Sequence, residues 1–158
     1  MTTCTVTTET PMGLLALSES AGFITHCRFA KGPHQRGPVS HVMRAALRQL
    51  EEYFAGRRTD FDLPLAPSGT PFQEKVWSAL QTIPYGEKWS YQKLAGEVDN
   101  PKAARAVGSA NAQNPICIII PCHRVIRASG EPGKYAGGDD VKVNLLDLEQ
   151  KGGSIAAA

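Results

Sequence analysis

Cys122 and His123 are the neighbouring residues with the clearest potential for chemistry. The thiol follows a nearly apolar run, residues 116–121, and Arg124 comes directly after the histidine. Nearby positive charge, or a base that takes the proton, turns a thiol into a nucleophilic thiolate. The base needs a third group to orient its imidazole, and Glu149 is the acid best placed by chain order. The pattern predicts a cysteine nucleophile; a structural cysteine beside a surface histidine stays open as the alternative.

Other uses of the cysteines fit the sequence poorly. A zinc site needs further ligands at regular spacing, and only His123 lies near Cys117 and Cys122 in the chain. A phosphatase loop needs an arginine six positions after its cysteine, where this chain has Ala128. The N-terminal sequence shows no secretory signal, so we expect free thiols, a reducing compartment and a cytoplasmic location.

Composition places the chain among ordinary globular proteins. Of 158 residues, 42% are hydrophobic and 20% are charged, which excludes a disordered chain and a disulfide-dense miniprotein. The longest apolar run is too short to span a bilayer, so no membrane association is expected. A net charge of +2 lacks the strongly basic character of many nucleic-acid-binding proteins. Residues 100–130 nevertheless contain no Asp or Glu, which indicates either an electropositive surface for an anion or a chance gap.

The first third of the sequence predicts a small sheet and a helix. Three short β-branched or apolar runs, separated by turn residues, indicate a meander of strands at 4–9, 14–18 and 22–29. Ser40 can cap a helix with an apolar face that ends at Gly56. A proline-rich connection follows at 57–69. We therefore divide the chain into an N-terminal α/β domain (1–68), a C-terminal domain (69–152) and a frayed tail (153–158).

The remainder is predicted to be mostly helical. Thr70 and Gln73 form a capping-box pattern before a helix that runs to Ile83. Ser90 starts a short helix. Asn100 is expected to cap a second helix over 102–112, with Pro101 at its first position, so the two helices form a plausible helix-turn-helix. An extended segment is expected at 116–120 and a last helix at 140–150. The fold class is α+β: a small N-terminal three-stranded antiparallel sheet with a helix, plus a mainly helical, winged-helix-like C-terminal domain.

The segment NPICIIIPCHRVI (114–126) closely resembles the active-site signature of the O6-alkylguanine-DNA alkyltransferases, which repair DNA by direct reversal. The order and spacing of the family extend to IPYGEKWSYQKLA (83–95), NPKAARAVGSAN (100–111) and LLDLE (145–149). The resemblance implies that Cys122 accepts the alkyl group once and irreversibly, without a metal or organic cofactor. It implies that His123 takes the Cys122 proton through water and that Glu149 holds His123.

The resemblance assigns further roles by position. Asn114 would brace the active-site turn, and Tyr91 would protonate the leaving guanine. Arg105 would replace a nucleotide flipped out of double-stranded DNA, which a monomer would bind through the minor groove. Other DNA contacts are expected at Ala104, Lys102, Ser109 and Ser90, and the guanine pocket is expected to be lined by Val125, Tyr135, Ala136 and Gly137.

Some departures and alternatives stay open. Many family members carry a serine where this chain has Ala136, so backbone N–H groups would have to bind the guanine O6. Cys4, His26 and Cys27 do not align with the zinc ligands that some members carry. A lesion-binding protein of the alkyltransferase-like class would lack the reactive cysteine, which this chain has. A helix-turn-helix regulator would prefer one undamaged DNA sequence.

Overall fold

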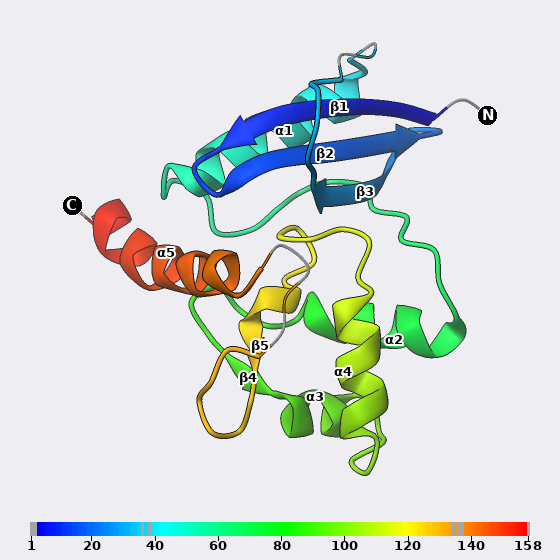
Figure 1. The fold of residues 1–158 in the computed structure, drawn as a ribbon, viewed down its shortest axis with the longest axis vertical. Coiled ribbons are helices and arrows are strands. Elements are labelled where there is room, and N and C mark those ends of the chain that lie inside the picture. Colours follow the sequence, from blue (N-terminus) through cyan, green and yellow to red (C-terminus); the bar gives the residue numbers. More distant parts are fainter. Residues whose placement is uncertain (1–2, 36, 38, 134, 136–137, 158) are drawn as a thin grey trace.

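A three-stranded sheet with one helix sits beside a group of helices (Figure 1). The structure, a computed structural model, describes residues 3–35, 37, 39–133, 135 and 138–157. An irregular segment leads from the helix of the sheet, α1 (His41–Phe54), to the first helix of the second group, α2 (Pro71–Leu80). Over the described residues, no helix combines the length and the apolar character needed to cross a bilayer.

The sheet is an antiparallel meander in the order β1-β2-β3, which confirms the predicted fold of this part. Its strands are β1 (Thr3–Thr10), β2 (Gly13–Ser20) and β3 (Phe23–Phe29). Alternate residues of a strand face the same side, so Leu15 and Leu17 are fully buried while the residues between and beside them are half-buried.

Helix α1 contacts all three strands and closes the core of the sheet. It begins where the sequence predicts, because the Ser40 hydroxyl accepts the Met43 N–H at 3.1 Å and satisfies one free donor of the first turn. The residues that α1 buries recur three or four positions apart, which places them on one face: Met43, Ala46, Leu50 and Tyr53.

The helix-turn-helix consists of α3 (Tyr91–Glu97) and α4 (Ala104–Ala112), and α4 packs against both α2 and α3. The prediction that Asn100 caps α4 and that the helix starts at residue 102 is wrong. Asp99 adopts a left-handed φ of 59°. The Ala103 N–H then donates to the Asn100 carbonyl at 2.9 Å, so Pro101 and Lys102 form the middle of a turn and are not part of the helix. The helix therefore begins at Ala104, and no side chain among the described residues caps it.

Two further helix ends differ from the prediction, and two short strands were not predicted. Helix α2 has the expected capping box but ends at Leu80, because a tight turn with the Ile83 N–H on the Leu80 carbonyl follows it. Helix α5 (Asp139–Ala157) continues through residues 153–157, which were expected to fray. Two short strands, β4 (Trp89–Ser90) and β5 (Val125–Ile126), pair in parallel and join the start of α3 to the segment after Cys122.

Candidate active site

Cys122 follows a tight turn, and the prediction of an extended segment at 116–120 is wrong. Ile116 makes one bridge to Cys27 of β3, and the chain then reverses, with the Ile120 N–H donating to the Ile116 carbonyl at 3.0 Å. An apolar run indicates burial, but burial alone does not distinguish a strand from a turn. The turn buries the whole run and delivers the Cys122 thiol to the interior, where it is 4% exposed.

Asn114 holds this turn together. Its side-chain amide donates to the Ile120 carbonyl at 2.8 Å and to the Ile116 carbonyl at 3.3 Å, and its oxygen accepts the Ile116 N–H at 3.0 Å. Ile118 has a φ of 72°, a conformation that costs a β-branched residue about 1–3 kcal/mol. The Asn114 hydrogen bonds offset that strain, because they satisfy backbone groups that no water reaches.

A single 3-10 turn, η1 (Cys122–Arg124), carries the three polar side chains of the signature, and all three are buried. His123 is fully buried, and its Nε2 lies 2.6 Å from Oε2 of Glu149 on α5. An ionised carboxylate only accepts hydrogen bonds, so Nε2 carries the imidazole proton. The other ring nitrogen, Nδ1, has no hydrogen-bond partner among the described residues and keeps its lone pair.

Glu149 is the centre of a buried polar network. Arg124 donates from Nε at 2.8 Å and from Nη2 at 3.1 Å to the two carboxylate oxygens, and its Nη1 donates to the Ile83 carbonyl at 2.6 Å. Tyr53 of α1 donates its hydroxyl to Glu149 Oε2 at 2.6 Å. The network therefore joins the helix of the sheet, the active-site turn and the last helix.

The network fixes the protonation states around Cys122. Burial by itself raises the pKa of Glu149, but the hydrogen bonds and positive charge of His123 and Arg124 outweigh it and lower that pKa to about 2. Burial also lowers the pKa of His123, although the hydrogen bond to Glu149 opposes the change. At neutral pH the pair is thus a carboxylate and a neutral imidazole whose free nitrogen can accept a proton.

The Cys122 thiol is held protonated in the resting protein. A side-chain hydrogen bond with Cys117 and burial raise the pKa of Cys122, while Asn114 and the positive charge of Lys142 act in the opposite direction. Lys142 is fully buried on α5, and its Nζ lies 5.9 Å from the centre of the Tyr91 ring. The thiol therefore needs both a base and a cation to become a thiolate.

An open cleft of about 800 Å³ runs between α3, α4 and the loop after β5. Tyr91 and Arg105 line it with Arg127 and Gly133, and Arg105 is exposed. The Tyr91 hydroxyl lies close to Gly133, where an added Cβ would meet it at 3.0 Å. Burial raises the pKa of Tyr91, so it keeps its proton at neutral pH and can donate it.

The remaining predicted residues fall in several places. Ala104 and Ser109 line the same cleft, and Lys102 is exposed in the turn before α4. The Ser90 hydroxyl caps α3 by accepting the Lys93 N–H at 3.0 Å. Val125 is buried in β5, and Tyr135 packs edge-on against Phe29. Ala136 and Gly137 lie outside the described residues.

Sequence reasoning missed four residues of the site: Tyr53, Arg124 as a partner of Glu149, Lys142 and Arg127. Tyr53 is 96 residues away from Glu149 and occupies an apolar helix face, so nothing in its surroundings in the sequence signals the contact. Lys142 lies seven residues before Glu149 on the same helix, and that periodicity was a usable signal.

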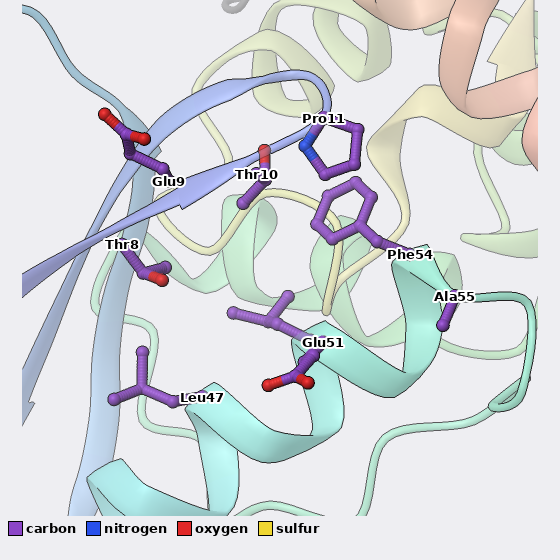
Figure 2. Close-up of a pocket in the computed structure, with 9 residues that line it drawn as sticks. Thr8, Glu9, Thr10, Pro11, Leu47, Glu51, Phe54 and Ala55 are labelled. Atoms are coloured by element: carbon purple, nitrogen blue, oxygen red, sulfur yellow. The ribbon is translucent and has the colours of Figure 1, made fainter.

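A second cavity, of about 400 Å³, lies between the end of β1 and α1 (Figure 2). Leu47, Glu51 and Phe54 project into it from α1, and Thr10 and Pro11 lie opposite. It holds no cysteine, histidine or lysine, so it offers no nucleophile or base of the Cys122 kind. Within the part of the chain that the structure describes, no group of three or more His, Cys, Asp or Glu residues could hold a metal ion.

The Glu149 network predicts a specific loss of stability in acid. The pKa of Glu149 falls from 4.5 to about 2 on folding, so its stabilisation is complete above pH 4.5 and is lost as the pH falls toward 2. This titration is worth on the order of 3 kcal/mol. The free energy of unfolding, measured by urea denaturation between pH 7 and 3, should fall less steeply below pH 4.5 in Glu149→Gln than in the wild type. Glu131→Gln, at an exposed site, should follow the wild type, whereas equal slopes for Glu149→Gln would contradict the assignment.

Comparisons with known proteins agree over most of the chain. Residues 71–151 match the model of the 6-O-methylguanine DNA methyltransferase DNA binding domain, and residues 4–67 match the ribonuclease-like domain of the same proteins. A methylated-DNA–protein-cysteine methyltransferase of Methanosarcina acetivorans is 49% identical over 147 residues, which cover 89% of this chain and 94% of the relative. One from Mycolicibacterium paratuberculosis is 45% identical over 150 residues, 92% of this chain and 91% of the relative.

Solved structures give the same result. The O6-methylguanine methyltransferase of Mycobacterium tuberculosis superposes with a TM-score of 0.87 at 43% identity, over 95% of this chain and 94% of that one. A structure of the mycobacterial protein in complex with DNA superposes with a TM-score of 0.84 at 44% identity, over 92% of each chain. Two family domains that together span most of the sequence, and relatives of this similarity, lead to one conclusion: the chain belongs to the 6-O-methylguanine DNA methyltransferase family.

Proposed function

We propose that this protein repairs DNA by direct reversal and moves the alkyl group of O6-alkylguanine onto Cys122. The observation that carries the proposal is the Cys122-His123-Glu149 arrangement, in which a buried carboxylate lies 2.6 Å from Nε2 and leaves Nδ1 of the neutral imidazole, in the residue next to Cys122, without a partner among the described residues. Membership of the family supplies the substrate class, a duplex that carries the lesion. All four cysteines, each within the described residues, are free thiols, which supports a cytoplasmic location.

The reaction follows from the residues around the thiol. The lesion cannot be reached inside a duplex, so it is flipped into the pocket at a cost of about a few kcal/mol. Arg105, exposed on α4, fills the space that the base leaves, and the small residues of α4 let the helix approach the minor groove. This geometry requires no second copy of the chain, so a monomer suffices.

Transfer is an in-line displacement at the alkyl carbon. His123 Nδ1 takes the Cys122 proton through one water molecule, and the positive charge of Lys142 stabilises the thiolate. The new S–C bond forms as the C–O6 bond breaks, and Tyr91 protonates the leaving guanine. The product is a thioether that water does not cleave, so each molecule acts once and no cofactor takes part.

The direct test is the covalent product. After incubation with a duplex that carries O6-methylguanine, the intact protein should gain one methyl group, and peptide mapping should place it on Cys122. Cys122→Ser should gain none, whereas Cys4→Ser should react like the wild type because Cys4 lies on β1. Wild-type protein of unchanged mass, with the lesion intact in the DNA, would refute the proposal.

Arg105 should matter only when a base must leave a duplex. Arg105→Ala should slow transfer from duplex DNA at least about tenfold, a change of about 1.4 kcal/mol in the barrier, and leave transfer from free O6-benzylguanine nearly unchanged. Lys31→Ala, at an exposed position in the loop after β3, is the matched control for loss of one positive charge. Equal losses on the two substrates would remove the role given to Arg105.

Lys142 should set the pH at which Cys122 reacts. Its charge opposes the rise in the Cys122 pKa that the Cys117 contact and burial cause, so Lys142→Met should move the acidic limb of the rate of transfer to higher pH. Single-turnover rates between pH 5 and 9 measure this shift. Lys151→Met, at an exposed position on the same helix, should leave the profile in place. An unchanged profile in Lys142→Met would show that the lysine does not act on the thiol.

A further inference from the structure

Cys117 is a second buried thiol in the active-site turn, and the proposed reaction does not use it. Its thiol interacts with that of Cys122, an interaction that changes the pKa of both groups, and its Sγ lies 4.0 Å from the Asn114 carbonyl oxygen. The two cysteines are five positions apart in the sequence. The hydrogen bond that closes the turn between Ile116 and Ile120, and the Asn114 amide that bonds both carbonyls, hold the two thiols together.

Cys117 also faces a different cavity from the one that receives DNA. This cavity, of about 330 Å³, is lined by Cys117, Asn114 and Arg28 together with Phe29, Ala112 and Gln113. Its lining shares Ala112 alone with the cleft of Tyr91 and Arg105, as far as the described residues go. A small solute can therefore approach Cys117 from the side of the sheet without entering the DNA cleft.

Several neighbours lower the pKa of the Cys117 thiol. The side-chain interaction with Cys122 has the largest effect, Tyr135 and the positive charge of Arg28 act in the same direction, and burial opposes them. Cys27, the third buried cysteine nearby, differs, because burial raises its pKa far above the usual range. Thiolates are the forms of cysteine that peroxides oxidise, so Cys117 is the thiol of the group most open to this chemistry.

We propose that Cys117 and Cys122 form a reversible disulfide when the protein meets a peroxide, and that this bond withdraws the alkyl acceptor. The Cys117 thiolate attacks hydrogen peroxide; an S–O bond forms, the O–O bond breaks, and hydroxide leaves with the electron pair. The sulfur is oxidised by two electrons to a sulfenic acid while the peroxide is reduced. His123 then takes the Cys122 proton, the Cys122 thiolate attacks Cys117 Sγ, the S–S bond forms as the S–O bond breaks, and the sulfenic oxygen takes up a proton and leaves as water.

The consequence for repair rests on the proposed function. A disulfide at Cys122 blocks the same sulfur that alkyl transfer uses, but a thiol reductant reverses it, whereas the thioether is permanent. Without a neighbouring thiol, an oxidised cysteine proceeds to sulfinic acid, which thiols do not reduce. Cys117 therefore protects a single-use nucleophile from an irreversible loss that would consume the protein without repair.

Peptide mass spectrometry of the full chain tests the bond itself. Trypsin cleaves after Arg105 and Arg124, so one peptide, residues 106–124, contains both cysteines. After treatment with hydrogen peroxide and then iodoacetamide, this peptide should be lighter than its reduced form by two hydrogen atoms and carry no blocking group. Dithiothreitol should restore both thiols and the ability to accept a methyl group from lesion DNA.

Two variants separate the outcomes. Removal of the Cys117 thiol removes the interaction that raises the pKa of Cys122. In Cys117→Ala, and in Cys117→Ser if the alanine variant is unstable, peroxide should therefore oxidise Cys122 to sulfinic acid, and dithiothreitol should fail to restore transfer. Cys4→Ser should behave like the wild type. A wild-type peptide in which both thiols are still blocked by iodoacetamide, or a bond that joins Cys117 to Cys27, would overturn the proposal. One further outcome separates the two proposals: the protein forms the disulfide after peroxide treatment and yet, before any treatment, accepts no methyl group from lesion DNA. That result would refute the proposed function but not the disulfide.

Discussion

The carboxylate of Glu149 is the group on which the arrangement of this site depends. It is 3% exposed, and it accepts hydrogen bonds from His123, Arg124 and Tyr53. A buried charge is tolerated only when its partners satisfy it, and removal of one member of such a set costs several kcal/mol. Tyr53 lies on α1, His123 and Arg124 lie on η1, and Glu149 itself lies on α5, so the same charge that orients the imidazole also fixes these three elements relative to one another.

This constraint explains why the sheet and its helix belong to the site although they carry no nucleophile. Tyr53 reaches Glu149 from α1, and the backbone of Cys27 on β3 accepts the Cys117 N–H at 2.8 Å and donates to the Pro115 carbonyl at 3.0 Å. The strained turn before Cys122 is thus supported on both sides. A protein that reacts once gains from such rigidity, because it needs no motion to release a product from Cys122.

The sequence predicted the elements well and their junctions poorly. Helices with side-chain caps at Ser40, Thr70 and Ser90 begin where these residues indicate, because a cap acts within four positions of the chain. The predictions for the start of α4 and for residues 116–120 were wrong, because both depend on left-handed backbone conformations, at Asp99 and Ile118, that the residue types do not indicate. Cys122, His123 and Glu149 were predicted from motif spacing and from the family resemblance, whereas the contact of Tyr53 with Glu149 has no signal in the surrounding sequence.

Glu149 holds His123 as a neutral imidazole with its proton on Nε2 and its lone pair on Nδ1. Nitrogen-15 NMR of the histidine rings distinguishes the two neutral tautomers and the imidazolium directly. At pH 7 the His123 signals, assigned with His123→Gln, should show a protonated Nε2 and a bare Nδ1, and they should begin to titrate only below the usual range for histidine, because burial lowers the His123 pKa. A proton on Nδ1, or an imidazolium at pH 7, would contradict the account.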